Sequence, residues 1–276
     1  MPELPELEVV SEVLNRHVTG VAILRAEVLP PGGPIVVRDL AQRGIEAALA
    51  GASFAHIYRR GKFLVLPVAD RAIYLVINPK LTGRLQLAAA GDKRYARTAL
   101  VFSFAGGQEL RYVDQKTMGQ VYLAVRPEDV PGFAEMGPEA LAIALDEFKA
   151  RLRPYRGEIK GILVRSEFVA GIGNAYADEI LWAAQIHPYR KRTQLTAEEI
   201  DRLYAAMRST LVAATDQVRA AMGENIYREP RDFLHIHMKT GQPCPRCGGP
   251  IAVVSANQRV TNFCRTCQPG GLFKYT

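Results

Sequence analysis

The chain has 276 residues with a formal net charge of +7, and 48% of its residues are hydrophobic while 23% are charged. This is an ordinary globular composition, which excludes a disordered chain, and its basic balance favours a polyanionic partner. No apolar run approaches the ~20 residues that cross a bilayer, so we expect a protein without membrane association.

The first half of the chain is predicted to form one helix followed by an antiparallel β-sandwich. Residues 3–18 carry apolar side chains at helical spacing. Short alternating runs then recur about every ten residues between turns, which is typical of an antiparallel sandwich or barrel. These runs are residues 21–24, 62–66, 72–77, 84–87, 99–104, 109–112 and 120–125.

After a proline- and glycine-containing linker at residues 127–137 the pattern becomes helical. Helices are predicted at residues 138–148, 160–169, 174–185 and 196–222, the last opening with capping-box spacing. Strand candidates 251–254 and 260–263 then flank a polar loop. The expected fold class is therefore α+β and multidomain. The predicted domains are the helix and sandwich (1–130), a helical lobe (131–240) and a terminal β-hairpin (241–276).

All four cysteines lie in the hairpin segment as two CxxC pairs, Cys244 with Cys247 and Cys264 with Cys267. Each pair places two sulfurs on one turn, and a hairpin brings the two turns together. The spacing therefore predicts a closed tetrahedral Zn²⁺ site with four thiolate ligands. Two disulfides are the alternative, but they need an oxidising compartment, and no signal peptide opens the chain.

The hairpin segment is basic. Residues 241–276 include arginines and a lysine but no acidic residue, and Arg259 stands at the end of the polar loop. A guanidinium there can bind a phosphate through two parallel hydrogen bonds. A solubilising surface arginine is the alternative, and the missing acidic residues favour a nucleic-acid contact.

The first residues have two interpretations. Proline and carboxylates are favoured in the first turn of a helix, which explains the sequence structurally. However, Met1 is normally removed before a small residue, which would leave Pro2 with a free secondary amine. An α-amine is roughly one-tenth neutral at pH 7, against fewer than one in a thousand for a lysine. Pro2 is thus a candidate Schiff-base nucleophile with Glu3 as its acid or base, and a retained Met1 would block this chemistry.

Two further motifs also stay open. The basic run at residues 59–62 is either a solvated charge run or a means of placing Lys62 against a phosphate or a leaving group. The glycine-rich turn at residues 171–174 opens a helix, where backbone N–H groups can approach a phosphate. Alternatively, Asn174 only caps that helix.

Taken together, these segments resemble bacterial formamidopyrimidine-DNA glycosylases from one end of the chain to the other. The resemblance implies a β-sandwich lobe, a helix–two-turn–helix lobe and a zinc finger with one structural Zn²⁺. It also implies double-stranded damaged DNA bound between the lobes, and a monomer in the bacterial cytoplasm, associated with the nucleoid. The motifs that carry the resemblance are Pro-Glu-Leu-Pro-Glu (2–6), Arg-Gly-Lys (60–62), Thr-Gly-Arg-Leu (82–85), the glycine-rich turn with its helix (171–181), Ile-His-Pro (186–188) and the cysteine pairs ending in Gln268.

The resemblance also implies residue roles. Pro2 is similar to the family's Schiff-base nucleophile, Glu3 to its acid/base partner, and Lys62 to the lysine that assists strand cleavage and holds a phosphate. Base chemistry requires the nucleotide to be extruded, and phosphate contacts on either side offset the unstacking cost of a few kcal/mol. The phosphate ligands implied in this way are Lys160, Asn174 and Arg259.

The chain departs from the family in two places. Where the family fills the emptied base stack with a methionine, an arginine and a phenylalanine, this sequence has Leu81, Thr117 and Met118. Leu81 and Met118 are still expected to act as apolar wedges. Thr117 cannot reach an orphaned base as an arginine would, although Lys116 could, so the opposite-base preference stays open. Residues 219–239 are shorter than the family's lesion-capping loop.

The sequence therefore predicts a bifunctional DNA glycosylase and abasic-site lyase. It would excise formamidopyrimidines and 8-oxoguanine-type purines through a Schiff base and cleave the strand by β,δ-elimination. The short capping segment leaves an alternative open, an endonuclease VIII-like preference for oxidised pyrimidines or abasic sites. A catalytically weak lesion-binding protein is a further alternative. A zinc-ribbon transcription factor would leave the N-terminal motif unexplained.

Overall fold

Residues 1–256 and 259–270 are described by the computed structural model, in which the chain forms two units. The first unit is Met1–Glu135 with Val218–Pro230, and the second is Met136–Gln217 with Arg231–Thr276. Residues 218–230 thus return to the first unit, and the hairpin belongs to the second. The boundaries between these units therefore differ from those predicted at residues 130 and 240. The division into three domains stays a prediction.

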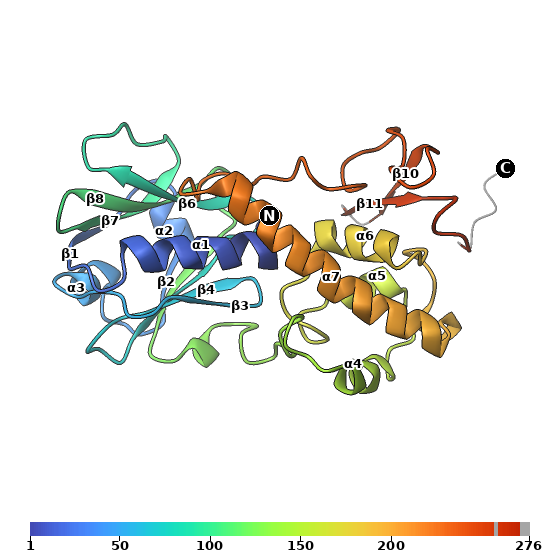
Figure 1. The fold of residues 1–276 in the computed structure, drawn as a ribbon. Helices are drawn as coiled ribbons and strands as arrows, with labels where there is room; N and C mark the ends of the chain where they lie inside the picture. The colour runs from blue at the N-terminus through green and yellow to red at the C-terminus, as the bar shows by residue number, and fades with distance from the viewer. Residues whose placement is uncertain (257–258, 271–276) are drawn as a thin grey trace. The chain divides into compact units, whose positions relative to one another are not determined.

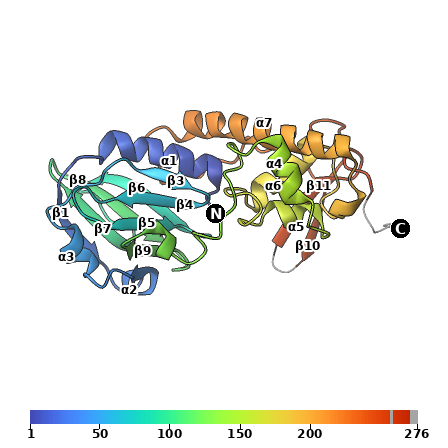
Figure 2. The same ribbon diagram turned by 90° about the horizontal axis from the view of Figure 1, so that it is seen from below.

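Two β-sheets build the first unit, stacked as the layers of a sandwich (Figures 1 and 2). One sheet is antiparallel throughout and has the order β1 (Ile23–Val28), β7 (Thr98–Phe104), β8 (Gln108–Asp114), β6 (Gly83–Ala89). The other has the order β2 (Val37–Asp39), β9 (Gln120–Ala124), β5 (Tyr74–Asn78), β4 (Phe63–Pro67), β3 (Tyr58–Arg60). Only β2 pairs in parallel, with β9, among these described strands. The predicted sandwich is confirmed.

Helix α1 (Leu4–His17) lies against β3 and β4 and carries the start of the chain (Figure 1). Its apolar face is fully buried, with Leu4, Leu7 and Leu14 at most 1% exposed. The helix begins after Glu3 because Pro5 suits its first turn and the Glu6 carboxylate accepts the Glu3 N–H at 2.8 Å. Short helices α2 (Gly33–Val36), α3 (Ile45–Leu49) and η1 (Pro127–Asp129) complete the unit.

The second unit is helical and ends in the hairpin. Its elements are α4 (Leu145–Leu152), α5 (Ile159–Leu163), α6 (Asn174–Ala183), η2 (Arg192–Gln194), α7 (Ala197–Met222), β10 (Ile251–Ala256) and β11 (Arg259–Cys264). Helix α7 opens with the predicted capping box, because Glu199 N–H donates to Thr196 Oγ1 at 3.3 Å and Thr196 N–H to Glu199 Oε2 at 3.0 Å. From Val218 onward this helix belongs to the first unit.

The helix predicted at residues 138–148 is wrong in its first half. The chain becomes helical only at Leu145. Before that point, Pro138 accepts the N–H of Ala170 at 2.8 Å, and Ala140 donates to the carbonyl of Ala170 at 3.2 Å. A pairing with a distant segment therefore satisfies the backbone groups that a helix would have used. The helix predicted at residues 160–169 is likewise shorter, since α5 ends at Leu163.

Across the described residues, no helix combines the length and the apolar character that a membrane crossing requires.

Candidate functional site

A narrow cavity lies at the start of α1, inside the first unit, and Pro2 forms part of its wall. Its other lining residues come from α1, β4, the β5–β6 turn with β6, and the segment around residue 226. They are Glu6, Leu7, Val10, Leu64, Pro79, Gly83, Arg84, Leu85, Met222, Ile226, Arg228 and Glu229. The N-terminal residues are thus buried against the sandwich rather than extended into solvent.

Two carboxylates follow Pro2 within four positions, and both are almost completely buried. Glu3 and Glu6 are each 1% exposed, and the Glu6 carboxylate binds the Glu3 N–H. Carboxylates held beside an amine in a dry site can take up and return protons. The carboxylate of Glu3, the direct neighbour of Pro2 in the chain, is thus almost completely buried, and its role as acid or base stays a prediction.

A third carboxylate, Glu229, was missed in the sequence. It accepts a hydrogen bond from the N-terminal ammonium of Met1 at 3.1 Å between the nitrogen and Oε1. Its Oε2 forms an ion pair with Arg84. Glu229 lies 228 positions from Met1 and belongs to no recognisable motif, so no local signal pointed to it.

Lys62 lies in the two-residue turn that joins β3 to β4. Gly61 adopts a φ of +57°, which glycine tolerates, and the half-buried Lys62 follows it. Arg59 connects this turn to α1, because its Nε binds Glu8 Oε2 at 2.7 Å and its Nη1 donates to the Gly61 carbonyl at 3.1 Å. The Lys62 turn is therefore fixed to the helix that carries Pro2 and Glu3.

Two loops that bear the predicted wedge residues are held together by the buried Asp114. Its Oδ1 accepts the Thr82 hydroxyl at 2.5 Å and the Lys116 N–H at 3.2 Å, and its Oδ2 accepts the Gly119 N–H at 2.7 Å. The loops expose their apolar tips, since Leu81 is 46% exposed and Met118 48% exposed. Exposed apolar side chains on a fixed scaffold are what insertion into a base stack requires.

In the second unit, Lys160 is 7% exposed and its ammonium is engaged by protein groups. Nζ forms an ion pair with Asp178 Oδ1 at 2.6 Å and donates to Thr261 Oγ1 at 2.8 Å and to the Val260 carbonyl at 3.2 Å. Lys160 thereby ties α5 to α6 and to strand β11. Its predicted role as a phosphate ligand stays a prediction, and a phosphate would have to share this ammonium with these partners.

Asn174 is the first residue of α6, and Gly173 rather than Asn174 is the N-cap. Its amide donates to the Val260 carbonyl at 2.7 Å, the same oxygen that Lys160 binds. Both side chains therefore meet the backbone directly beside Arg259, at the start of β11. The side chain of Arg259 lies outside the described residues, so its predicted phosphate contact stays a prediction.

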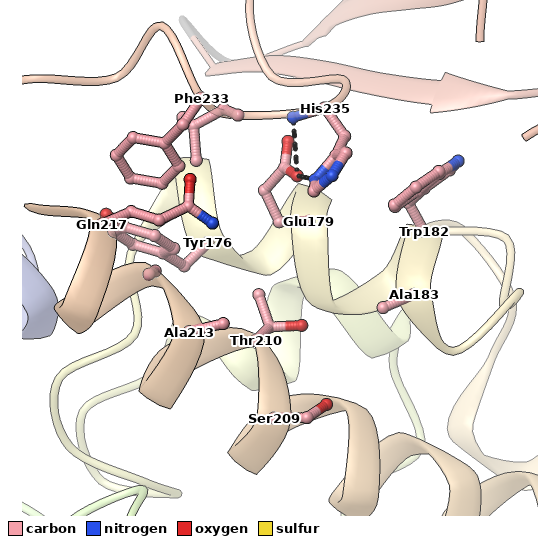
Figure 3. Close-up of a pocket in the computed structure, with 12 residues that line it drawn as sticks. Tyr176, Glu179, Trp182, Ala183, Ser209, Thr210, Ala213, Gln217, Phe233 and His235 are labelled. Carbon is pink, nitrogen blue, oxygen red and sulfur yellow. Dashed lines mark hydrogen bonds and ion pairs between the residues drawn. The ribbon is translucent and has the colours of Figure 1, made fainter. Parts of the chain in front are cut away.

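Two neighbouring carboxylates of α6 hold the segment that leads into the hairpin. Glu179 accepts the backbone N–H groups of His235, Ile236 and His237 at 2.8–2.9 Å, and it also binds the His235 ring at 3.1 Å. Asp178 binds the His237 ring at 2.8 Å. Glu179 forms part of the wall of a cavity of about 190 Å³ between α6, α7 and residues 233–235 (Figure 3).

This clamp by Glu179 predicts a pH-dependent attachment of residues 235–237. Burial alone would raise the pKa of Glu179, but the hydrogen bonds from the His235 ring and from the three N–H groups outweigh it and lower the pKa. The Glu179 bond raises the pKa of His235 against the opposing effect of burial. The ionised Glu179 carboxylate therefore stabilises the attachment of residues 235–237 fully above about pH 4.3, and this stabilisation is lost as pH falls through the lowered pKa of Glu179. The protonated His235 ring stabilises the attachment fully below about pH 6.5, and this stabilisation is lost as pH rises through the raised pKa of His235.

We expect Glu179→Gln to leave at least one of the N–H groups without its acceptor, at a cost of about 1–3 kcal/mol. Hydrogen exchange at the amides of residues 235–237 should accelerate accordingly, most strongly between about pH 5 and pH 6.5. Glu147→Gln, an exposed change in the same unit, is the control and should leave this exchange unaltered. Equal protection of residues 235–237 in the two variants would contradict the clamp.

The four cysteines come together at the base of the hairpin. Their sulfurs all lie within 4.8 Å of one another, with Cys244 to Cys267 at 3.8 Å and Cys247 to Cys264 at 3.4 Å. Four thiolates around one Zn²⁺ at about 2.3 Å would place the sulfurs about 3.8 Å apart. A disulfide would bring two sulfurs to about 2.05 Å, so the disulfide alternative is wrong.

The surroundings of the sulfurs differ. Burial opposes ionisation of Cys244, but hydrogen bonds from the N–H groups of Arg246 and Cys247 and from Trp182 outweigh it and lower the pKa of Cys244 to about 6. Burial raises the pKa of Cys264 and of Cys267, so the fit to a metal rests on the convergence of the four sulfurs. Gln268 attaches the cluster to the segment that follows α6, because it accepts the Cys264 N–H and donates to the Ile186 carbonyl, each at 2.9 Å. The donor set and the geometry therefore fit one structural Zn²⁺.

Comparisons with known proteins agree along the whole chain. Residues 1–121 match the formamidopyrimidine-DNA glycosylase N-terminal domain, residues 136–224 its H2TH domain, and residues 241–270 the zinc finger found in FPG and IleRS. The chain is 37% identical to the formamidopyrimidine-DNA glycosylase of Symbiobacterium thermophilum, over 98% of this chain and 90% of that protein. It is equally 37% identical to that of a Nocardioides species, over 98% and 95%.

Solved structures give the same result. A complex of the Lactococcus lactis enzyme with DNA containing FAPY-dG has a TM-score of 0.86 at 29% identity, covering 97% of this chain and 100% of that one. A complex of MutM with DNA containing carbocyclic 8-oxo-G has a TM-score of 0.85 at 30% identity, covering 98% and 100%. The similarity therefore includes both units and the hairpin.

Proposed function

Because the chain belongs to the formamidopyrimidine-DNA glycosylase family, we propose that it excises oxidised purines from damaged duplex DNA with Pro2 as the nucleophile and then cleaves the strand. The family consists of bifunctional glycosylases and abasic-site lyases. Relatives with solved structures were bound to DNA containing FAPY-dG or 8-oxo-G, which supports these lesions as substrates. The four-cysteine finger holds one structural Zn²⁺.

The proposed reaction begins with the Pro2 amine, freed by removal of Met1. The amine attacks C1′ of the flipped nucleotide and loses its proton while the bond from C1′ to the base breaks and the base leaves with that electron pair and a proton. Opening of the sugar ring then gives the Schiff base, with Glu3 transferring the protons. Loss of a C2′ proton expels the 3′ phosphate, a second elimination expels the 5′ phosphate, and Lys62 holds a phosphate during cleavage.

One observation carries the proposal. Pro2 forms part of the wall of a cavity and is followed in the chain by Glu3 and Glu6, whose side chains are almost completely buried, in the same unit as the Lys62 turn. A positioned general acid or base increases the rate of a reaction by about 10²–10⁴-fold. An amine of ordinary reactivity therefore reacts faster when a carboxylate is fixed beside it.

Borohydride trapping tests the proposal. Duplexes carrying 8-oxoguanine, a formamidopyrimidine, an oxidised pyrimidine or an abasic site are incubated with the protein, and the reduced covalent complex is measured. We expect trapping and base release with the purine lesions. Preferential trapping on the oxidised pyrimidine would instead support endonuclease VIII-like specificity. Binding to all duplexes without any trapping would show a lesion-binding protein and overturn the proposal.

We propose that Arg259, Lys160 and Asn174 grip the DNA backbone, while Leu81 and Met118 fill the emptied stack. Arg259→Ala should weaken binding about equally for every lesion and reduce the slope of log K against log salt by about one. Arg259→Lys, which keeps the charge but not the paired hydrogen bonds, should retain the slope. A selective loss for one lesion would show that Arg259 reads the base. The exposed Arg126, whose guanidinium is bound to Asp129, provides the charge-removal control Arg126→Ala.

The proposed setting is the DNA of the bacterial nucleoid in the cytoplasm, where the enzyme would act as a monomer. The basic net charge supports an encounter with DNA by electrostatic attraction.

A further inference from the structure

Glu229 lies on a segment that has no regular secondary structure yet is firmly docked on the first unit. Residues after α7 return to this unit, where Ile226 is 2% exposed and Tyr227 stacks on Tyr95 with ring centroids 4.7 Å apart. At the beginning of the segment, Glu224 binds Arg16 at 2.8 Å and His17 at 2.6 Å. These contacts hold the backbone that leads to Glu229 against the first unit.

The carboxylate of Glu229 is itself held in one orientation. Its side chain is 12% exposed, and Arg84, 19% exposed, forms an ion pair with Oε2. Arg84 is anchored in turn, because its Nη1 donates to the Gly83 carbonyl at 2.7 Å. Oε1 receives the ammonium at the start of the chain at 3.1 Å. The guanidinium stabilises the negative charge, so the carboxylate can serve as a fixed acceptor for an amine.

Removal of Met1 transfers the terminal amine to Pro2, which lines the same cavity as Glu229 and Arg84. We propose that Glu229 is a positioning residue for this amine, accepting the remaining N–H of the neutral Pro2 so that the nitrogen lone pair faces the cavity. This inference rests on the proposed function, in which Pro2 is the nucleophile. A secondary amine has one N–H and one lone pair, so a single fixed acceptor is sufficient to set the direction of attack.

The competing interpretation is that Glu229 only attaches its segment to β6 through Arg84. The two interpretations differ in what a substitution changes. If Glu229 only attaches the segment, a substitution should lower the stability of the protein but leave the rate of covalent attack per folded molecule unchanged. A positioning role predicts slower covalent attack at unchanged DNA affinity, together with a different pH profile, because a carboxylate beside an ammonium stabilises the protonated amine.

Single-turnover borohydride trapping on an abasic-site duplex separates these roles, with Met1 removal verified by mass spectrometry in every sample. We expect Glu229→Gln to slow trapping by about ten- to a hundredfold while the Kd for DNA changes less than about twofold. The acid limb of its pH–rate profile should move to lower pH, since the protonated amine loses its partner. Glu229→Asp should recover part of the rate.

Glu224→Gln is the matched control. It weakens the attachment of the same segment at another place, where Glu224 binds Arg16 and His17. It should trap DNA at the wild-type rate with the wild-type pH profile. If Glu229→Gln traps at the wild-type rate with an unaltered profile, the positioning role is excluded while the proposed function stands. If the wild-type protein traps nothing, the proposed function itself fails.

Discussion

Pro2→Gly is expected to slow both base release and strand cleavage by about 10²-fold or more. Glycine still offers an α-amine, but the ring that fixes the nitrogen against the cavity wall is lost, and misplacement of about 1 Å can cost about 10²-fold. Glu3→Gln should abolish base excision and spare part of the cleavage at preformed abasic sites, because an abasic sugar needs no leaving-group protonation. Single-turnover excision and borohydride trapping on matched duplexes measure both effects.

Pro5→Ala is the control for the helix start. Pro5 lies in the first turn of α1 and is buried, so this change perturbs the same turn while leaving Pro2 and its amine in place. It should lower stability but keep the rate per folded molecule close to that of the wild type. Full activity in protein shown by mass spectrometry to retain Met1 would refute the mechanism, since the Pro2 nitrogen would then be an amide.

Local signals in the sequence predicted the hairpin and the longest helix correctly. The CxxC spacing depends on turns of a few residues, and the four sulfurs do converge. The Thr196 capping box fixes the start of α7 through two hydrogen bonds between residues three positions apart. The seven apolar runs predicted as strands overlap strands of the sandwich. The reason is their apolar content between turns rather than strict alternation, because β4, β5, β7, β8 and β9 are buried at nearly every residue.

Elements determined by distant pairing could not be predicted in this way. Residues 138–144 have helical periodicity, but their backbone pairs with Ala170. Strands β2 and β3 are three residues long each, too short for a periodic pattern. The same applies to the site. Glu229 reaches Met1 across 228 positions, and no motif in its neighbourhood marks the contact.

Lys160 illustrates the limit of transferring a role by resemblance. The resemblance implies a phosphate ligand, which stays a prediction, and the structure adds contacts to Val260 and Thr261, 100 and 101 positions away. Those partners tie α5 to β11 directly beside Arg259. A network that involves a buried ammonium and the hairpin backbone depends on the tertiary fold, so it was absent from every local pattern.

Removing the metal is expected to abolish DNA binding while the first unit stays folded. The hairpin has a very small core, made of Ile236, Cys244, Ile251 and Cys264 with Trp182 and Cys267 packed against it. Structural Zn²⁺ supplies about 10–16 kcal/mol of apparent binding free energy in isolated fingers, which becomes folding free energy. Without it, β11 should no longer present the Val260 carbonyl to Lys160 and Asn174, nor hold Arg259 beside them.

Cys247→Ser tests this expectation sharply, because Cys247 is exposed and the change removes a thiolate with little loss of packing. Thr266→Ala, an exposed change between Cys264 and Cys267, should retain the metal and serves as the control. Metal content, affinity for an abasic-site duplex and hydrogen exchange in the sandwich strands are measured in the full-length chain. Cys247→Ser should lose zinc and DNA affinity together while exchange in β4, β5 and β7 stays slow. Metal content near zero in a fully active protein would refute the structural role of zinc, whereas rapid exchange in the sandwich would show that the first unit depends on the finger for its fold.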